Sequence, residues 1–411
     1  MIYFYSHCIP TVRRDKMKLN RRDFILFSGL SFALKDLRSE KIPTPSHESW
    51  IELSLNNMEW NLTRIRQKVK VPVMGVIKAN AYGHGLVEFG KQLARLGIDA
   101  LMVCKLKEAV RLREAGVSCP IYNFGPMSAK NTPLLVKYKI SQFLHSGDFN
   151  NMNQRAEKLG AQINIHIHAD TGMNRMGIPF QKVMSVIKQA ASLRGLSVSG
   201  LSTTLCEDKQ FDKVQLKRLQ SIYNESQKSG INLGARHAAS SAGIFESPSY
   251  YMDMIRPGIT LYGSYPNQKT KEEDSLSLRP VLAFKSRVVD VKTLHPGDSV
   301  SYLRAYKAAK KEKIAVIPVG YSDGYPHSAS GKLRVLIRGK KYPILNTITA
   351  NHMEALINTE PSISPGDEVA LIGAQGNEKI TADDIAEWAG ISNYKVLIGL
   401  NPLIPKILLK N

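Results

Sequence analysis

The feature that most constrains the fold is a regular alternation of strand-like and helix-like segments. Eight short apolar segments are typical of strands, and most are separated by amphipathic helical patterns. The strand-like segments are 71–78, 99–106, 119–126, 140–146, 163–170, 198–205, 235–242 and 254–263. Parallel strands need long crossovers, usually helices, so this pattern predicts an α/β fold with a (β/α)8 barrel of the TIM type. Functional residues are then expected at the carboxyl ends of the strands.

The pattern changes near residue 282, where the helical segments stop. Short β-rich runs with turn residues follow, which predicts a mostly-β domain. One short helix is expected at 381–390, with Thr381 as its N-cap and Gly390 as its C-cap. The predicted organisation is a leader and linker at 1–47, the barrel at 48–281 and the β-domain at 282–411.

Composition narrows the classes of function. The 411-residue chain has a formal net charge of +21, which could indicate nucleic acid or a membrane surface as a partner. Its basic residues are scattered through amphipathic segments and form no stripe with interleaved aromatics, so we interpret them as a solvated surface and expect no nucleic-acid partner. The four cysteines have neither metal-site spacing nor a disulfide pattern, so no metal site is expected.

The N-terminal segment resembles an export signal. Arg21 and Arg22 come directly before a short, moderately apolar run that is too short to span a bilayer as a helix. This arrangement resembles a twin-arginine signal, which would place the protein in the periplasm or outside the cell. The alternative is a basic tail on a cytoplasmic enzyme.

A lysine stands at the end of the first barrel strand. Lys78 follows a buried apolar run and precedes small residues, Tyr82 and two glycines. A strand-end lysine often only extends to solvent. Here the glycines allow backbone to approach a ligand closely, and a partly desolvated amine is a suitable Schiff-base nucleophile.

These segments resemble a known family. VPVMGVIKANAYGHG resembles the lysine motif of the alanine racemases, which are fold-type III enzymes that use pyridoxal 5′-phosphate (PLP). HADTGMNRMG, HAASSAG, IRPGITLYG and DSVSYLRAY resemble further motifs of the family. The resemblance covers roughly residues 48–411.

The resemblance implies roles for the cofactor-binding residues. Lys78 would carry PLP as a Schiff base, and Arg175 would bind the cofactor's phenolic oxygen and the substrate carboxylate with its bidentate fork. Arg256 would face the pyridine nitrogen. Because a guanidinium cannot accept a proton from that nitrogen, the ring stays a weak electron sink, which favours racemisation over transamination and decarboxylation.

The phosphate of PLP is expected to bind at the ends of three strands. By resemblance, Ser241 and the backbone amides of Gly258 and Ile259 form the cradle, in which oriented donors meet an anion. Tyr82 would be a further phosphate contact.

Racemisation needs a base on each face of the α-carbon, because the proton leaves one side and returns on the other. Lys78 would serve one face and Tyr302 the other. In the family this tyrosine reaches the active site of the partner subunit, which implies a homodimer. Tyr321 would lie near the substrate entrance and Ala350 beside the substrate.

Several neighbouring positions depart from the family pattern. His168 stands where a lysine, frequently carbamylated, is common, and Thr204 stands where a histidine supporting the pyridine-facing arginine is expected. The usual CMDQ reads TANH, with Ala350 and Asn351 in place of methionine and aspartate, and Pro402 replaces a tyrosine. Smaller residues on the substrate side should widen the pocket.

The sequence therefore favours a PLP-dependent isomerase that interconverts L- and D-alanine, either for D-alanine supply to a cell wall or for reshaping external amino acids. Two alternatives remain. One is a racemase of other or more amino acids, such as serine, lysine or arginine, and the other is a non-catalytic PLP-binding protein. A barrel decarboxylase of basic amino acids is disfavoured by Arg256.

Overall fold

The predicted barrel is present in the first part of the chain. The computed structural model describes residues 48–145, 149–358 and 362–410, which belong to one compact unit. Parallel strands pair in the order β2-β3-β4-β5-β6-β8-β9, and a short β7 pairs with β6. Their bounds are β2 Met74–Val76, β3 Ala100–Val103, β4 Ile121–Asn123, β5 Ile140–Leu144, β6 Ile163–Asp170, β7 Ile178–Pro179, β8 Leu196–Ser202 and β9 Ala235–His237.

The eighth predicted segment closes the barrel without becoming a regular strand. Ile255 forms an isolated parallel bridge with Val73, and its carbonyl accepts the amide of Met74 at 2.9 Å. The amide of Arg256 donates to the carbonyl of Ala239 at 2.8 Å, which ties this segment to the chain that follows β9. Pro257 has no amide proton, so the ladder cannot continue regularly. The expected (β/α)8 barrel is confirmed.

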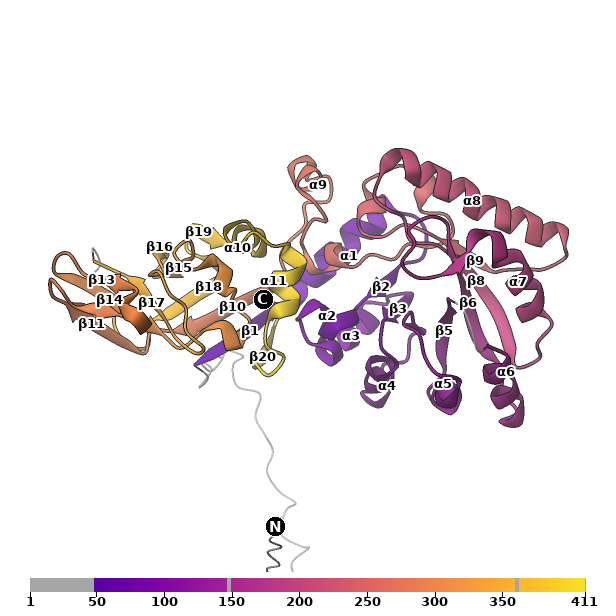
Figure 1. Cartoon of the computed structure of the whole chain (residues 1–411), viewed down its shortest axis with the longest axis horizontal. Helices are drawn as coiled ribbons and strands as arrows, with labels where there is room; N and C mark the ends of the chain where they lie inside the picture. Colours follow the sequence, from indigo (N-terminus) through magenta and orange to yellow (C-terminus); the bar gives the residue numbers. More distant parts are fainter. Residues whose placement is uncertain (1–47, 146–148, 359–361, 411) are drawn as a thin grey trace, which may run out of the picture. The chain divides into compact units, whose positions relative to one another are not determined.

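Helices connect most of the strands and lie outside them (Figure 1). Helix α3 shows why they pack there, because its buried residues Leu86, Phe89 and Leu93 recur at helical spacing on one face. The bounds are α1 Leu55–Lys68, α2 Lys78–Tyr82, α3 Leu86–Arg95, α4 Leu106–Glu114, α5 Thr132–Tyr138, α6 Phe149–Lys158, α7 Val183–Ala191, α8 Lys209–Lys228 and α9 Gln268–Glu273.

The segment after Lys78 has an unusual backbone. Ala79, Asn80, Ala81 and Tyr82 all have positive φ, between 49° and 55°, so α2 is a left-handed turn. Each such residue costs roughly 1–2 kcal/mol relative to a right-handed turn. The Asn80 side chain stabilises the turn by accepting the amide of Leu86 at 3.0 Å. Strain of this size is typical of functional sites.

The C-terminal domain is mostly β, as predicted. A sheet in the order β16-β15-β18-β10-β1-β20 forms its centre, and the strands β11, β14 and β17 form a second sheet. The bounds are β10 Leu282–Arg287, β11 Asp290–Leu294, β12 Ser299–Val300, β13 Tyr306–Lys307, β14 Glu312–Ile317, β15 Arg334–Ile337, β16 Lys340–Pro343, β17 Met353–Leu356, β18 Glu368–Gln375, β19 Glu378–Ile380 and β20 Lys406–Leu409.

The first strand of the described chain belongs to this C-terminal sheet. Strand β1, Ser49–Ser54, pairs antiparallel with β10 and parallel with β20. Its residues Trp50, Ile51 and Leu53 are buried. The β-domain sheet therefore includes residues from before the barrel, which the predicted boundaries at 48 and 282 assign to the barrel.

Two helices, not one, lie near the C-terminus. Helix α10, Ala382–Ala389, has the predicted caps Thr381 and Gly390. The unpredicted helix is α11, Asn393–Gly399, whose N-cap Ser392 accepts the amide of Lys395. The amide group of Asn393 holds α11 in place by donating to the carbonyl of Tyr265 at 3.2 Å and to Asp383 Oδ1 at 2.7 Å.

The predicted export signal lies outside the described residues. Within the described part of the chain, none of the helices combines the length and apolar character needed to cross a membrane. Cys104, Cys119 and Cys206 are free thiols.

The turn after α2 gives a test of the fold. Gly83 has φ +83°, and a Cβ there would lie 2.0 Å from the carbonyl oxygen of Leu397 in α11. Gly83→Ala should lower the free energy of unfolding by more than about 2 kcal/mol, because steric overlap adds to left-handed strain. Gly97→Ala is the matched control, since Gly97 has φ +69° and nothing within 4 Å of its Cβ position. Equal losses in urea denaturation would contradict the close approach.

Candidate active site

Lys78 lies at the mouth of the barrel, two residues after the end of strand β2. The amide of the preceding Ile77 donates to the carbonyl of Met102 at 2.9 Å, which anchors this backbone to strand β3. Lys78 is half-buried, and the left-handed turn begins with the residue after it. Burial raises the pKa of the Cys104 thiol, whereas the positive charges of Lys78 and Arg175 oppose that rise. Both cations therefore lie within electrostatic range of the same thiol.

Arg256 is buried and held by several acceptors. Its Nη1 donates to Nδ1 of His237 at 2.5 Å and to the carbonyl of His237 at 2.7 Å. Its Nη2 donates to the carbonyls of Thr203 and Ala238 at 2.7 and 3.2 Å. Burial lowers the pKa of Arg256 to about 10, so the guanidinium is still a cation at neutral pH. Four of its five N–H donors are thus satisfied, and among the described residues only Nε–H lacks an acceptor.

His237 and His166 form a chain of hydrogen bonds that begins at Arg256. Because Nδ1 of His237 accepts from Arg256, its proton must be on Nε2, which lies 2.8 Å from Nδ1 of His166. Burial lowers the pKa of His166 to about 3, and burial followed by the charge of Arg256 lowers the pKa of His237 well below its usual value. Both imidazoles are therefore neutral at pH 7.

Sequence reasoning did not assign these histidines. The motif HAASSAG begins with His237, so its position at the end of a barrel strand was the available signal. Thr204 stands where a histidine that supports this arginine is expected, but among the described residues no hydrogen bond joins Thr204 to Arg256. Its hydroxyl lies 3.4 Å from Nε2 of His168 instead. Arg256 is supported by His237 and by the carbonyls of Thr203 and Ala238.

Ser241, Gly258 and Tyr82 form a small cradle. Ser241 Oγ accepts the amides of Gly258 at 2.9 Å and Thr260 at 3.4 Å. A Cβ at Gly258 would lie 2.7 Å from the Tyr82 hydroxyl, so only glycine leaves this space open. Of the predicted phosphate residues, the structure brings Ser241, Gly258 and Tyr82 together, with Ile259 next in the chain as the first residue of a short 3-10 helix.

Tyr82 is fixed by other aromatic rings. Its ring centroid lies 4.8 Å from that of Tyr262 and 5.8 Å from that of Tyr394 in α11. Burial and the neighbouring Tyr394 raise the pKa of Tyr82, so its phenol remains protonated and can donate a hydrogen bond. Tyr394 is a residue of the C-terminal domain that sequence reasoning did not assign to the site.

Arg175 lies in the exposed loop after β6, near the buried His168. His168 Nδ1 lies 2.8 Å from the hydroxyl of Ser202. Burial, then His145 and the two arginines Arg256 and Arg175, lower the pKa of His168 well below its usual value. A neutral imidazole therefore stands where a carbamylated lysine would be anionic, and it gives Arg175 no charge partner.

The remaining predicted residues lie on the C-terminal domain. Tyr302 is the first residue of a short 3-10 helix and is 79% exposed, and Tyr321 is 52% exposed. Ala350 is half-buried, and its carbonyl accepts the amide of Ser322, next to Tyr321. Among the described residues, no hydrogen bond or ring contact joins Tyr302 to the barrel residues. Pro402 is exposed.

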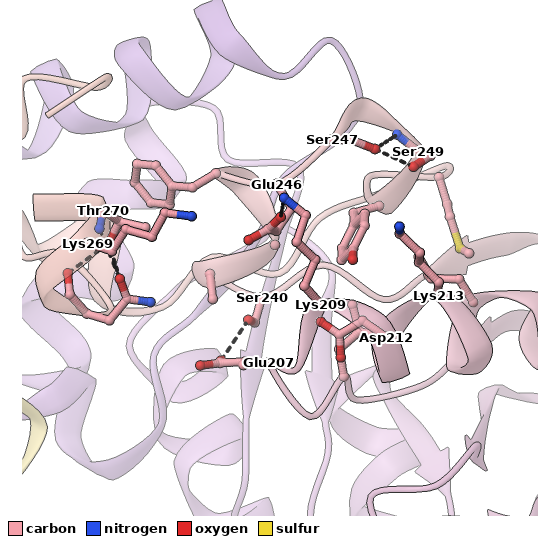
Figure 2. Close-up of a pocket in the computed structure, with 18 of the residues that line it drawn as sticks. Glu207, Lys209, Asp212, Lys213, Ser240, Glu246, Ser247, Ser249, Lys269 and Thr270 are labelled. Carbon is pink, nitrogen blue, oxygen red and sulfur yellow. Dashed lines mark hydrogen bonds and ion pairs between the residues drawn. The ribbon is translucent and has the colours of Figure 1, made fainter. Parts of the chain in front are cut away.

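A cavity of about 710 Å³, shown in Figure 2, has none of the predicted site residues in its lining. Ser240, the neighbour of Ser241, points toward Glu207 at its edge, at 3.5 Å. Four lysines and four carboxylates line the cavity, so it has no charge preference: Lys209, Lys213, Lys217, Lys269, Glu207, Asp212, Glu246 and Glu273. The chemistry lies instead at the barrel mouth.

The barrel-mouth residues suit PLP. An amine at Lys78, a buried guanidinium with one free Nε–H and a cradle that a side chain at Gly258 would fill are all at the carboxyl ends of barrel strands. No group of histidine, cysteine or acidic side chains that could bind a metal is found in the described part of the chain. The fold and site define a barrel enzyme of the PLP-dependent class.

Comparison with known proteins identifies the family. Residues 53–266 match the alanine racemase N-terminal domain and residues 281–408 the alanine racemase C-terminal domain. Alanine racemase 1 of Clostridium acetobutylicum is 36% identical over 369 residues, 88% of this chain and 95% of that protein. Alanine racemase of Methanococcus maripaludis is 33% identical over 372 residues, 89% and 99% of the two chains.

Solved structures with a similar fold are also alanine racemases. Alanine racemase of Clostridium difficile 630 superposes with a TM-score of 0.85 at 30% identity, over 90% of this chain and 97% of that one. Alanine racemase of Bacillus anthracis with bound L-Ala-P gives 0.82 at 26% identity, over 90% and 97%. The chain belongs to the alanine racemase family, whose members depend on PLP.

The buried histidines predict a pH-dependent stability. His166, His168 and His237 are neutral in the folded protein, whereas unfolded imidazoles gain protons near pH 6.5. The unfolded state then binds more protons, so the free energy of unfolding should fall below pH 6.5 by about 1.4 kcal/mol per pH unit for each histidine. Urea denaturation between pH 7.5 and 5 measures this slope, and His166→Gln should reduce it. An unchanged slope in that variant would contradict the buried, neutral assignment.

Proposed function

We propose that the protein is a PLP-dependent racemase that interconverts L- and D-alanine. The observation that carries this proposal is the buried Arg256, whose only free donor among the described residues is Nε–H. A cation fixed there can donate to the pyridine nitrogen but cannot accept a proton from it. This arrangement favours return of the α-proton over decarboxylation or transamination.

Different residues of this chain bind the cofactor and the substrate. Bound PLP would supply a ring that withdraws electrons from the substrate's α-carbon and so eases loss of the α-proton. Ser241, Gly258 and Tyr82 hold its phosphate, and Arg175 orients the substrate carboxylate with its fork. Lys78 holds the cofactor and moves the α-proton on one face.

Tyr302 supplies the base on the opposite face. Its 79% exposed side chain stands in a loop where Ser301, Leu303 and Arg304 all have positive φ. Strained, exposed loops of this kind suit a surface that a partner completes. We propose a homodimer in which Tyr302 enters the partner's barrel mouth, with Tyr321 and Ala350 of the same domain near the substrate.

The main test is racemisation by the PLP-loaded protein, followed by chiral chromatography. L-Alanine should be converted, and L-serine, L-lysine and L-arginine measured in parallel define the specificity. Lys78→Ala should lose activity by about a thousandfold or more, because it removes both the covalent link and one base. Lys91→Ala, at an exposed position in α3, is the control and should retain activity. An active Lys78→Ala variant would overturn the proposal.

Mixed dimers test the shared site. Lys78→Ala and Tyr302→Phe homodimers should each be inactive, but subunit exchange creates dimers with one intact site. Random exchange should restore about a quarter of wild-type activity, because half of the dimers are mixed and each has one complete site. If Tyr302 acted within its own chain, mixing would restore nothing, and a Tyr302→Phe homodimer that still racemised alanine would argue against the base itself.

We also propose that the enzyme is exported. Outside the cytoplasm it would supply D-alanine to the cell wall or change the configuration of external amino acids. The support is the paired Arg21 and Arg22 before a short apolar run. Export in a folded state would let the enzyme acquire PLP in the cytoplasm. Fractionation of cells that express the full chain, with Arg21→Lys and Arg22→Lys together as the comparison, tests this location.

A further inference from the structure

A buried carboxylate in helix α4 joins the segments that follow two neighbouring barrel strands. Glu108 is only 8% exposed. Its Oε1 accepts the amide of Asn80, in the left-handed turn after Lys78, at 3.3 Å. Its Oε2 accepts the amide of Cys104, the residue after strand β3, at 3.4 Å. Burying a carboxylate is costly unless it is hydrogen-bonded, and both oxygens of Glu108 are bonded to backbone.

The bond to Cys104 alone would be ordinary capping of a helix. Glu108 is the third residue of α4, where a negative charge is favoured by the helix dipole, and the N-cap Lys105 provides no side-chain bond. Capping does not explain the bond to Asn80. Asn80 lies 28 residues earlier in the chain and belongs to the preceding strand–helix unit.

Asn80 is the residue at which the strained turn is held. Its side-chain oxygen accepts the amide of Leu86 and its carbonyl accepts the amide of Gly85, both at 3.0 Å. Those two partners belong to the end of the same segment, so the bond from its amide to Glu108 is the one that fixes Asn80 relative to the next part of the barrel. Strained backbone persists only where its surroundings hold it in place.

The charge of Glu108 also lies close to Lys78. The Lys78 charge lowers the pKa of the Cys104 thiol, whereas the Glu108 charge raises it. The lysine and the carboxylate are therefore within electrostatic range of the same thiol, at the end of β3. Glu108 thus has a hydrogen bond to the turn after Lys78 and a charge opposite to that of Lys78.

We propose that Glu108 is a positioning residue for Lys78, because by holding the amide of Asn80 it keeps the left-handed turn, and with it the Lys78 amine, in the orientation that binds PLP. This inference rests on the proposed function, in which Lys78 holds the cofactor. Glu108 acts through the backbone of the turn and not on the substrate. When the bond is lost, the turn relaxes and Lys78 leaves this orientation.

The test is the rate at which PLP leaves the loaded full-length protein. Glu108→Asp keeps the negative charge near the start of α4, but its side chain is one methylene shorter and cannot bridge both amides. PLP should be released about tenfold faster, because a hydrogen bond to a charged group is lost. Absorbance of the protein-bound cofactor after gel filtration measures this rate, and an unchanged rate would overturn the proposal.

Glu114→Asp is the matched control in the same helix. The Glu114 carboxylate is exposed and accepts the hydroxyl of Tyr138 at 2.8 Å. This variant makes the same chemical change away from the turn and should release PLP at the wild-type rate. Equal acceleration in both variants would show a general effect of shortening a side chain in α4 and would overturn the positioning role.

Hydrogen exchange gives a readout that does not depend on activity. In the PLP-loaded wild type the amide of Asn80 should exchange slowly, and in Glu108→Asp it should exchange faster. If only the amides at the start of α4 lose protection, Glu108 is a helix cap and the proposal is wrong. An unprotected Asn80 amide in the wild type would also overturn it, whether or not the variant folds.

Kinetics separate positioning of Lys78 from binding of the substrate. Glu108→Asp should lower kcat for alanine by about tenfold, because a misplaced amine transfers the proton poorly. KM should stay within about threefold of the wild type, since the proposed carboxylate ligand Arg175 lies in another loop. A change in KM alone would contradict a role exerted through Lys78.

The two proposals fail separately. If no amino acid is racemised, the proposed function fails, and PLP release and hydrogen exchange still decide the role of Glu108. If alanine is racemised but Glu108→Asp releases PLP and exchanges the Asn80 amide as the wild type does, only the positioning role fails.

Discussion

The interaction on which the rest of the site depends is the burial of the Arg256 guanidinium with nearly all of its donors satisfied. A buried cation is costly unless it is hydrogen-bonded, and here Arg256 has four acceptors, three of them backbone carbonyls of Thr203, His237 and Ala238. Those carbonyls come from the ends of strands β8 and β9, so the position of the charge is set by the barrel itself. The neutral His237 completes the set because its tautomer is fixed by His166.

The sequence predicted the barrel and the β-domain because periodicity is a local property. Alternating apolar runs and amphipathic helices show the (β/α)8 pattern, and the caps of α10 were readable from Thr381 and Gly390. Helix α11 was missed because Asn393–Gly399 is short and apolar, and its position depends in part on a contact with Tyr265, which is distant in sequence. The place of β1 in the C-terminal sheet is likewise a long-range pairing that no local pattern contains.

Some features of the site could also be predicted from local sequence, and others could not. Lys78, Arg175, Ser241 and Arg256 stand in motifs at strand ends, so the sequence could place them at one edge of the barrel. The left-handed turn at Ala79–Tyr82 and the chain of hydrogen bonds through His166 could not be predicted, because they depend on backbone strain and on side chains that meet across the barrel. For the same reason, only the structure shows that His168 is neutral and bonded to Ser202, or that Glu108 accepts the amide of Asn80.

The parallel pairing of β1 with β20 has a consequence for how the protein is made. Strand β1 is among the first described residues to be synthesised, but one of its two neighbours, Lys406–Leu409, follows it in the chain only after the whole barrel and most of the β-domain. Contacts between such distant segments form late, because a very long loop must close first. Until both neighbouring strands are present, the apolar Trp50, Ile51 and Leu53 lack the sheet that buries them in the folded protein. The C-terminal sheet can therefore form in full only after the barrel segment between its first strand and its other strands has been synthesised.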